Sequence, residues 1–367
     1  MDYGLDTKST RLKTFNTIFI ITWLLIACFP FIWTFWGSFK VRADFFSRSD
    51  WWYAISAFNT LIETGGKFTT NAYTQAWTEG EFWKASKNTI IVTVFVVSIS
   101  LFLGTLGAYA LSRSTEKYAF WILMAALIFR AMPHITLVSG YLFPFFELQI
   151  WGILPTTIVV LVAINQPFTL WLLYSFFKTV PKELDESALI DGCSYFQAFR
   201  HIIMPVMWPG VITAGLFSLM LAYNDFTVTA LLLNQENHTM VPKIQSYLGT
   251  NQHEGNLMWA VSAVVSATAP LFMLVMFFQR QVISGLTAGL FSLMLAYNDF
   301  TVTALLLNQE NHTMVPKIQS YLGTNQHEGN LMWAVSSVVS ATAPLFILVM
   351  FFQRQIISGL TAGAVKG

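Results

Sequence analysis

Long apolar segments constrain this chain more than any other feature of its sequence. A helix needs about 20 apolar residues to cross the hydrocarbon core of a bilayer. The eight segments of that kind lie near residues 15–37, 88–111, 119–142, 152–176, 209–233, 257–278, 285–307 and 331–352. The chain is therefore expected to be all-α, a polytopic transmembrane helical bundle with eight spans.

The composition argues against a water-soluble domain of this length. Charged residues make up 11% of the 367 residues and the mean hydropathy is +0.56, whereas soluble domains carry about 25% charged residues. The net charge of +1, without a basic tail or stripe, gives no indication of nucleic-acid binding. Cys28 and Cys193 fit neither a disulfide framework nor a metal site. No cofactor and no metal are expected.

The placement of lysine and arginine predicts which side of the membrane the termini occupy. The loops after the second, fourth and sixth predicted spans are richer in these residues than the loops after the third, fifth and seventh. Because basic loops stay in the cytoplasm, both termini are predicted to be cytoplasmic. The first loop disagrees with this orientation, but it holds roughly 50 residues, a length at which the rule weakens.

A long repeat occupies the C-terminal half. Residues 213–286 recur 74 positions later at 287–360, with three differing pairs, Ala263/Ser337, Met273/Ile347 and Val282/Ile356. Internal repeats of transporters are only weakly similar in sequence. The near-identity therefore indicates a recent tandem duplication or an error in assembling the sequence. The repeated unit holds two spans, so its second copy changes no upstream topology.

The segment between the fourth and fifth predicted spans, residues 181–210, is the most acidic of the chain. Residues 182–190 lack helix breakers and begin with acidic side chains, which suits a helix dipole. Asp191-Gly192 predicts a turn, and residues 195–204 predict a second short helix that Pro205 ends. A polar, helical loop between two spans indicates a docking role.

Polar residues within the predicted spans form a second group of candidates. A charged group there costs about 2.5–3.5 kcal/mol and usually faces a cavity or a partner. The candidates for a hydrated translocation path are Asn165, Gln166, Asn224 and Asp225, with repeat copies at Asn298 and Asp299. The alternative is contact between helices, in which Asp225 pairs with Arg130 or bonds a neighbouring amide.

The acidic loop resembles the EAA loop of ABC-importer permeases, whose pattern is E-A-A, D-G, nine residues and I-x-L-P. The matching residues are Glu186-Ser187-Ala188, Asp191-Gly192 and, after nine residues, Ile202-Ile203-Met204-Pro205. Ser187 and Met204 depart mildly from the pattern. Segments 29–40, 222–226 and 359–367 resemble carbohydrate-uptake permeases of the MalG type. Over residues 10–286 and the last few residues, the chain is identified as a member of that family.

The resemblance implies the permease subunit of an ATP-driven, binding-protein-dependent importer for a sugar or sugar-like solute in the bacterial inner membrane. It implies a six-span type I core, here with a duplicated hairpin. The implied partners are a second permease subunit in a heterodimer, two cytoplasmic ATPase subunits, an extracytoplasmic solute-binding protein and membrane lipid. The implied ATPase-docking residues are Glu186, Ala188, Asp191, Gly192, Ile202 and Pro205. Glu186 is expected to pair with a basic ATPase side chain; the alternative is a cap on a solvated helix.

The expected organisation has four parts: residues 1–84 with the N-terminal tail, first span and outer loop, the permease domain 85–286, the repeat 287–360 and a cytoplasmic tail 361–367. The chain lacks a nucleotide-binding motif and is not expected to be an enzyme, because Gly65-Gly66-Lys67 fails the Walker pattern. An ion-coupled secondary carrier is the alternative function, although it would need broken helices in matched halves. A membrane-embedded enzyme would need clustered acidic or histidine residues at one depth, which the sequence does not contain.

Overall fold

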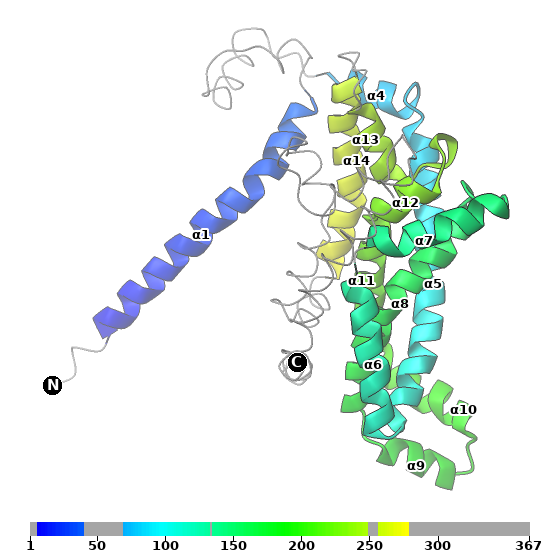
Figure 1. Ribbon diagram of the computed structural model, residues 1–367. Coiled ribbons are helices and arrows are strands. Elements are labelled where there is room, and N and C mark those ends of the chain that lie inside the picture. The colour runs from blue at the N-terminus through cyan, green and yellow to red at the C-terminus, as the bar shows by residue number, and fades with distance from the viewer. Residues whose placement is uncertain (1–5, 40–68, 133, 249–255, 279–367) are drawn as a thin grey trace. The chain divides into compact units, whose positions relative to one another are not determined.

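The computed structural model describes residues 6–39, 69–132, 134–248 and 256–278 (Figure 1). Within these residues the secondary structure is helical, apart from an isolated bridge between Gly152 and Leu233. The chain divides into two compact units, Met1–Trp83 with Ile244–Pro270, and Lys84–Lys243 with Leu271–Gly367. The predicted all-α fold is confirmed for this part of the chain.

The first unit contains α1 (Asp6–Gly37), α4 (Asn71–Trp77) and most of α14 (Asn256–Phe277). Apolar side chains such as Trp23 and Phe31 are exposed on α1, as expected of a helix that faces lipid. The hydroxyl groups of Ser38 and Tyr73 lie 2.7 Å apart, which joins the end of α1 to α4. Ser262 Oγ of α14 donates to the Ala72 carbonyl at 3.1 Å.

The other helices follow in chain order. They are α5 (Phe82–Arg113), α6 (Glu116–Ala131), α7 (His134–Glu147), α8 (Leu154–Thr179), α9 (Glu183–Ile190), α10 (Tyr195–Ala198), the π-helix η1 (Phe199–Ile203), α11 (Met204–Tyr223), α12 (Thr227–Leu232), the 3₁₀ helix η2 (Gln235–Asn237) and α13 (Met240–Tyr247). In the second unit α8 packs against α6 and α11.

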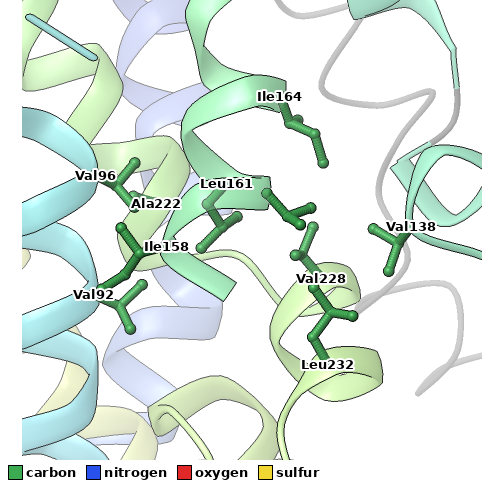
Figure 2. Close-up of a cluster of buried hydrophobic side chains, with 10 residues drawn as sticks. Val92, Val96, Val138, Ile158, Leu161, Ile164, Ala222, Val228 and Leu232 are labelled. Atoms are coloured by element: carbon green, nitrogen blue, oxygen red, sulfur yellow. The ribbon is translucent and has the colours of Figure 1, made fainter. Parts of the chain in front are cut away.

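Three groups of buried apolar side chains line α8 from end to end. Near its start, Ile158 and Leu161 pack with Val92 of α5 and Val228 of α12 (Figure 2). Trp171 packs with residues of α6. Near its C-terminal end, a third group joins α8 to α5, η1 and α11; its buried members are Ala108, Leu172, Leu173, Phe177, Val180, Ile203, Met207, Val211, Ala214 and Phe217. Helix α8 is therefore the centre of this unit.

Five helices of the described chain are long and apolar enough to span a membrane: Thr17–Gly37, Phe82–Arg113, Leu154–Thr179, Tyr195–Tyr223 and Leu257–Leu274. They overlap the predicted first, second, fourth, fifth and sixth spans. The seventh and eighth predicted spans, with the second copy of the repeat, lie outside the described residues. The outer-loop segment 40–68 also lies outside them.

The prediction of one helix at 119–142 is wrong. Helix α6 ends at Ala131 and α7 begins at His134. Met132 before Pro133 has φ −69° and ψ 138°, an extended conformation that proline imposes on the residue before it. Proline also lacks the N–H that a continuing helix needs. Each of the two helices is shorter than a full span.

Two boundaries near the predicted fifth span also need correction. Pro205 does not end the helix that starts at Tyr195; it follows the π-helix η1 directly and lies inside a helical segment that continues into α11. The chain is helical from Tyr195 to Tyr223. In addition, the predicted span 209–233 is not one helix, because α11 ends at Tyr223 and α12 starts at Thr227.

Candidate docking loop and translocation path

The turn that follows α9 depends on a glycine backbone. Gly192 has φ +86°, and a Cβ added there would meet nothing within 4 Å. Its N–H bonds the Leu189 carbonyl at 3.1 Å, and the Cys193 N–H bonds the Ala188 carbonyl at 3.0 Å. These bonds satisfy the last carbonyls of α9, as in the common glycine C-caps of helices. Glycine is required here by conformation and not by space.

A reciprocal cap starts the next helix. Ser194 N–H donates to Gln197 Oε1 at 2.8 Å, and Gln197 N–H donates to Ser194 Oγ at 3.4 Å. This capping box fixes the start of α10, with its N-cap Ser194 two residues after Gly192. The S-x-x-Q spacing in the sequence is the signal from which this cap could have been predicted.

The predicted docking residues divide into buried and accessible ones. Glu186, Asp191, Gly192 and Pro205 are exposed, Ile202 is half-buried, and Ala188 is buried against the rest of the unit. The structure therefore places Glu186 on the free side of α9. Helix α9 packs against η1, so the first part of the EAA motif, at Glu186 to Ala188, lies close to its second part, which begins at Ile202.

Three exposed apolar residues accompany this acidic surface. Ile190, Tyr195 and Phe196 are 85%, 73% and 64% exposed. They lie at the end of α9 and the start of α10, on either side of the Gly192 turn. Apolar and aromatic side chains gathered on a polar loop are typical of a protein interface. The EAA pattern does not include them, although their apolar character in an acidic segment is visible in the sequence.

Asp185 was not among the predicted site residues, yet its side chain links the loop to α5. Its Oδ1 accepts a hydrogen bond from the Tyr109 hydroxyl at 2.5 Å, and its Oδ2 lies 2.7 Å from Arg113 Nη2. Both partners belong to the last two turns of α5. Asp185 is buried, whereas the neighbouring Glu183 and Glu186 are exposed.

Asn165 links two helices of the candidate path. Its Nδ2 donates to Ser218 Oγ at 2.8 Å and to the Ser218 carbonyl at 3.3 Å, which joins α8 to α11. Within the described residues, its Oδ1 has no hydrogen-bond partner although it is buried. The same holds for Oε1 of Gln166, whose amide nitrogen lies near Gly104 of α5. Two buried acceptors are thus left open at neighbouring positions of α8.

Asn224 and Asp225 do not lie deep in a helix, as their position in the predicted fifth span implied. They occupy the break after α11, because their side chains satisfy backbone groups that a helix would use. Asn224 Nδ2 donates to the Met220 carbonyl at 3.1 Å. Asp225 Oδ1 accepts from the N–H groups of Val228 and Thr229 at 3.0 and 3.1 Å, so it caps α12.

Arg130 and His134 lie on either side of the break between α6 and α7 and are hydrogen-bonded to each other. Arg130 is buried and interacts electrostatically with Asp225. The hydrogen bonds of Asp225 to the backbone of α12 and its attraction to Arg130 agree with the alternative in which Asp225 makes contacts between helices. The neighbouring Asn224 is exposed.

One helix connects the two candidate regions. Helix α11 has 20 residues and continues directly from η1 and the docking loop to Asn224. At 1.5 Å per residue its length is about 30 Å. Ser218, the partner of Asn165, lies six residues before Asn224, which corresponds to about 9 Å along the axis. The polar candidates therefore lie near the C-terminal end of α11, and the docking loop lies at its N-terminal end.

Relatives of known role match most of the chain. The permease protein of the trehalose/maltose transport system of Thermococcus litoralis is 32% identical over 270 residues, 72% of this chain and 91% of the relative. The sulfoquinovosyl glycerol transport system permease of Agrobacterium fabrum is 31% identical, covering 72% of this chain and 89% of the relative. The diacetylchitobiose uptake system permease protein DasC of Streptomyces coelicolor is 28% identical, covering 71% and 90%.

A solved structure supports the same fold. A chain from a bacterial ABC transporter involved in the import of the acidic polysaccharide alginate matches with a TM-score of 0.57 at 18% identity, covering 76% of this chain and 99% of that one. Residues 100–287 match the profile of the binding-protein-dependent transport system inner membrane component family. This match includes the docking loop and α11. The chain belongs to that family of inner-membrane transport permeases.

Proposed function

We propose that this chain is the permease subunit of an ATP-driven, binding-protein-dependent ABC importer and forms the translocation path for a sugar or sugar-like solute. The observation that carries the proposal is the set of relatives that this chain matches over about nine tenths of their length. They are named for transport of a disaccharide, of trehalose or maltose, and of a sugar glycoside. A secondary carrier has no such support.

The docking loop is the proposed contact with the ATPase. Ile190, Tyr195 and Phe196 supply exposed apolar area, and Glu186 supplies an accessible carboxylate beside it. A charge-assisted bond from a basic ATPase side chain to Glu186 would orient the contact. In this arrangement the loop and both termini lie in the cytoplasm of a bacterial cell. A second permease subunit completes the pore, two ATPase subunits hydrolyse ATP, and an extracytoplasmic protein delivers the solute.

Asn165, Gln166, Asn224 and Asp225 are the proposed polar contacts of the path. Support comes from the open acceptors Asn165 Oδ1 and Gln166 Oε1, which suit the hydroxyl groups of a sugar. Asn224 adds an exposed amide beyond the end of α11. Because α11 runs from the docking loop to this amide, a displacement at the ATPase would reach the path through one helix.

The proposed permease domain is residues 85–286, preceded by the first span and outer loop and followed by the repeat. We assign the first copy of the repeat, 213–286, to the fifth and sixth spans of the six-span core. The family match, which ends at residue 287 where the second copy begins, supports this assignment. The second copy at 287–360 would then lie outside the core, and 361–367 would be a cytoplasmic tail.

The test is purification of the complex through an affinity tag on this chain, followed by uptake measurements in vesicles. We expect an ATPase to copurify and ATP to drive uptake of at least one of radiolabelled maltose, trehalose and diacetylchitobiose. Glu186→Lys should leave the chain inserted but reduce ATPase recovery and uptake together. Lys117→Glu, which reverses an exposed charge outside the docking loop, is the control. Uptake driven by an ion gradient without ATP would contradict the proposal.

A further inference from the structure

The contacts of Asp185 point beyond the exposed docking surface to the helix that lies beneath it. Asp185 belongs to the first turn of α9 and is 9% exposed. A buried carboxylate is costly unless charged and hydrogen-bonding partners surround it. Here both oxygens have such neighbours: Tyr109 donates to Oδ1 and Arg113 lies against Oδ2. These three residues are called the α5–α9 cluster below.

Arg113 joins three helices through one planar group. Besides Asp185, its Nη1 donates to the carbonyls of Val180 at 3.1 Å and Phe177 at 3.3 Å. These carbonyls lie at and just after the C-terminal end of α8, where helix carbonyls lack the partners they have in the interior. The Phe177 carbonyl also accepts a hydrogen bond from the Val180 N–H at 3.2 Å. A guanidinium can meet a carboxylate and two carbonyls at once, because its donors are arranged as a fork, whereas a lysine ammonium lacks this geometry.

Tyr109 extends the cluster towards the start of α11. Its ring packs against Phe177 of α8 with centroids 5.7 Å apart and against Phe199 of η1 at 4.9 Å. Arg113 lies over the same ring, 5.6 Å from its centroid. The inward face of α9 therefore rests on a group of charged and aromatic side chains from α5, α8 and η1. Ala188, on the same buried face, allows the close approach.

The covalent path from the docking loop leads to α11 and not to α5. Helix α11 continues from the loop through η1. Helix α5 meets the loop through the α5–α9 cluster, across 76 residues of sequence between Tyr109 and Asp185. If a bound ATPase displaces α9, the movement can therefore reach α5 only through side-chain contacts such as those of the α5–α9 cluster.

We propose that Tyr109, Arg113 and Asp185 are positioning residues that make α9 and the cytoplasmic end of α5 move as one body when the ATPase changes state. The proposal rests on the proposed docking of an ATPase at this loop. It assigns α5 a part in coupling in addition to α11, and it gives Asp185 a role distinct from that of Glu186. Glu186 faces the partner, whereas Asp185 faces the pore helices.

The test measures a distance between the two parts that are proposed to move together. One spin label is placed on Cys193, which follows the Gly192 turn, and the other on Lys117→Cys in the first turn of α6, directly after α5 ends. Cys28→Ser removes the other native thiol. The complex, purified with its own ATPase, is measured without nucleotide and after trapping with ADP and vanadate. The intact cluster should give the same distance distribution in both states.

Asp185→Asn keeps the size of the side chain and removes its charge. It should produce a second distance population, or a broader one, that appears only in the trapped state. Tyr109→Phe, which removes one hydroxyl and keeps the ring contacts, should do so more weakly, and the double variant should show less than the sum of both effects because the residues act as a unit. Lys178→Gln, which changes a cation near the end of α8, is the control and should leave the distances unchanged.

Three outcomes would overturn the proposal. Unchanged distributions in Asp185→Asn would show that α9 and α5 move together without the cluster. A lowered unfolding temperature with unchanged distributions would show that the cluster only stabilises the fold. A wild-type distance that already differs between the two states would show that α9 moves independently. If no ATPase copurifies with the wild-type chain, the proposed function fails instead, whatever the variants do.

Discussion

Asn165 of α8 donates two hydrogen bonds to Ser218 of α11, one to its hydroxyl at 2.8 Å and one to its carbonyl at 3.3 Å. The pair joins two helices that also pack through Gly210, where a Cβ would come within 2.8 Å of the Phe176 ring. Hydrogen bonds and small residues are the usual means by which helices associate in a membrane, where apolar surface gives no preference for protein over lipid. The α8–α11 contact uses both.

Removing the Ser218 hydroxyl should weaken this contact modestly. Ser218→Ala deletes the shorter bond and leaves the bond to the carbonyl, so we expect a loss of about 0.6–1.5 kcal/mol in stability. The measurement is the midpoint of thermal unfolding in detergent. Ser175→Ala is the matched control, because its hydroxyl bonds the Trp171 carbonyl of its own helix. Equal effects of the two changes would contradict a specific contribution from the bond between helices.

Gly192 should be sensitive to any side chain. Gly192→Ala places a Cβ in open space but at φ +86°, so we expect a conformational cost of about 1–2 kcal/mol. The result should be a displaced docking turn and reduced recovery of the ATPase with the tagged chain. Gly140→Ala is the control, because a Cβ there also meets nothing within 4 Å, and the glycine lies in α7 without a positive φ. If both variants retain the ATPase equally, the turn conformation is not required.

Cysteine labelling can separate the two roles considered for Asn224 and Asp225. If they face a hydrated path, Asn224→Cys and Asp225→Cys should react with a small water-soluble thiol reagent, and a transported sugar should slow the reaction. Asn224 should react faster, because it is exposed whereas Asp225 is half-buried and caps α12. Leu173→Cys, in the buried core, serves as the unreactive control. Lack of reaction at both positions in every nucleotide state would favour a purely structural role.

Deleting residues 287–360 should preserve transport. The deletion removes the second copy of the repeat and rejoins the first copy to the C-terminal tail, and it removes an even number of predicted spans. We therefore expect ATP-driven uptake by the shortened chain at a rate comparable with that of the full chain. Loss of uptake by a shortened protein that still inserts and stays stable would show that the second copy is needed. The mass of the native protein would establish whether the repeat is present.

Acid should destabilise the segment around His238. Burial lowers the pKa of the His238 imidazole below its ordinary value of 6.5, and the charge of Lys243 lowers it further. The unfolded chain then binds a proton more readily than the folded one, so stability is full above about pH 6.5 and falls as the pH drops towards the folded pKa. His238→Gln should reduce this loss in unfolding midpoints measured between about pH 8 and pH 5. His201→Gln, at an exposed position, is the control; an equal reduction there would refute the assignment.

Local signals predicted the docking helix well. The acidic start of α9 and the Asp191-Gly192 turn are encoded by adjacent residues, and both occur in the structure. Hydropathy predicted the wrong helix bounds where residues that break a helix interrupt an apolar segment. Pro133 and the Asn224-Asp225 pair lie inside apolar segments, so a count of apolar residues runs across them although each breaks the helix. The chemistry of these residues, weighed before segment length, would have predicted both breaks.

The contacts of Asp185 could not be predicted in the same way. Asp185 is one of four acidic residues in a short segment, and its burial depends on α5, 76 positions before it at Tyr109. A single sequence gives no reason to choose it over Glu186. The selection comes from helix packing, which turns one acidic side chain inward and leaves its neighbours exposed.

The π-helix η1 has a consequence for the length of the docking segment. Each residue of an α-helix turns the chain by about 100°, so adding one residue would rotate everything beyond it to a different face. A π turn accommodates one extra residue within a local widening, which leaves the helix on each side in its original orientation. Relatives in which this segment is one residue shorter could therefore form an ordinary α-helix between Phe199 and Ile203. Ser218 and Asn224 would then keep their orientation relative to α10, whereas the loss of one residue early in α11 would rotate them to a different face of the helix.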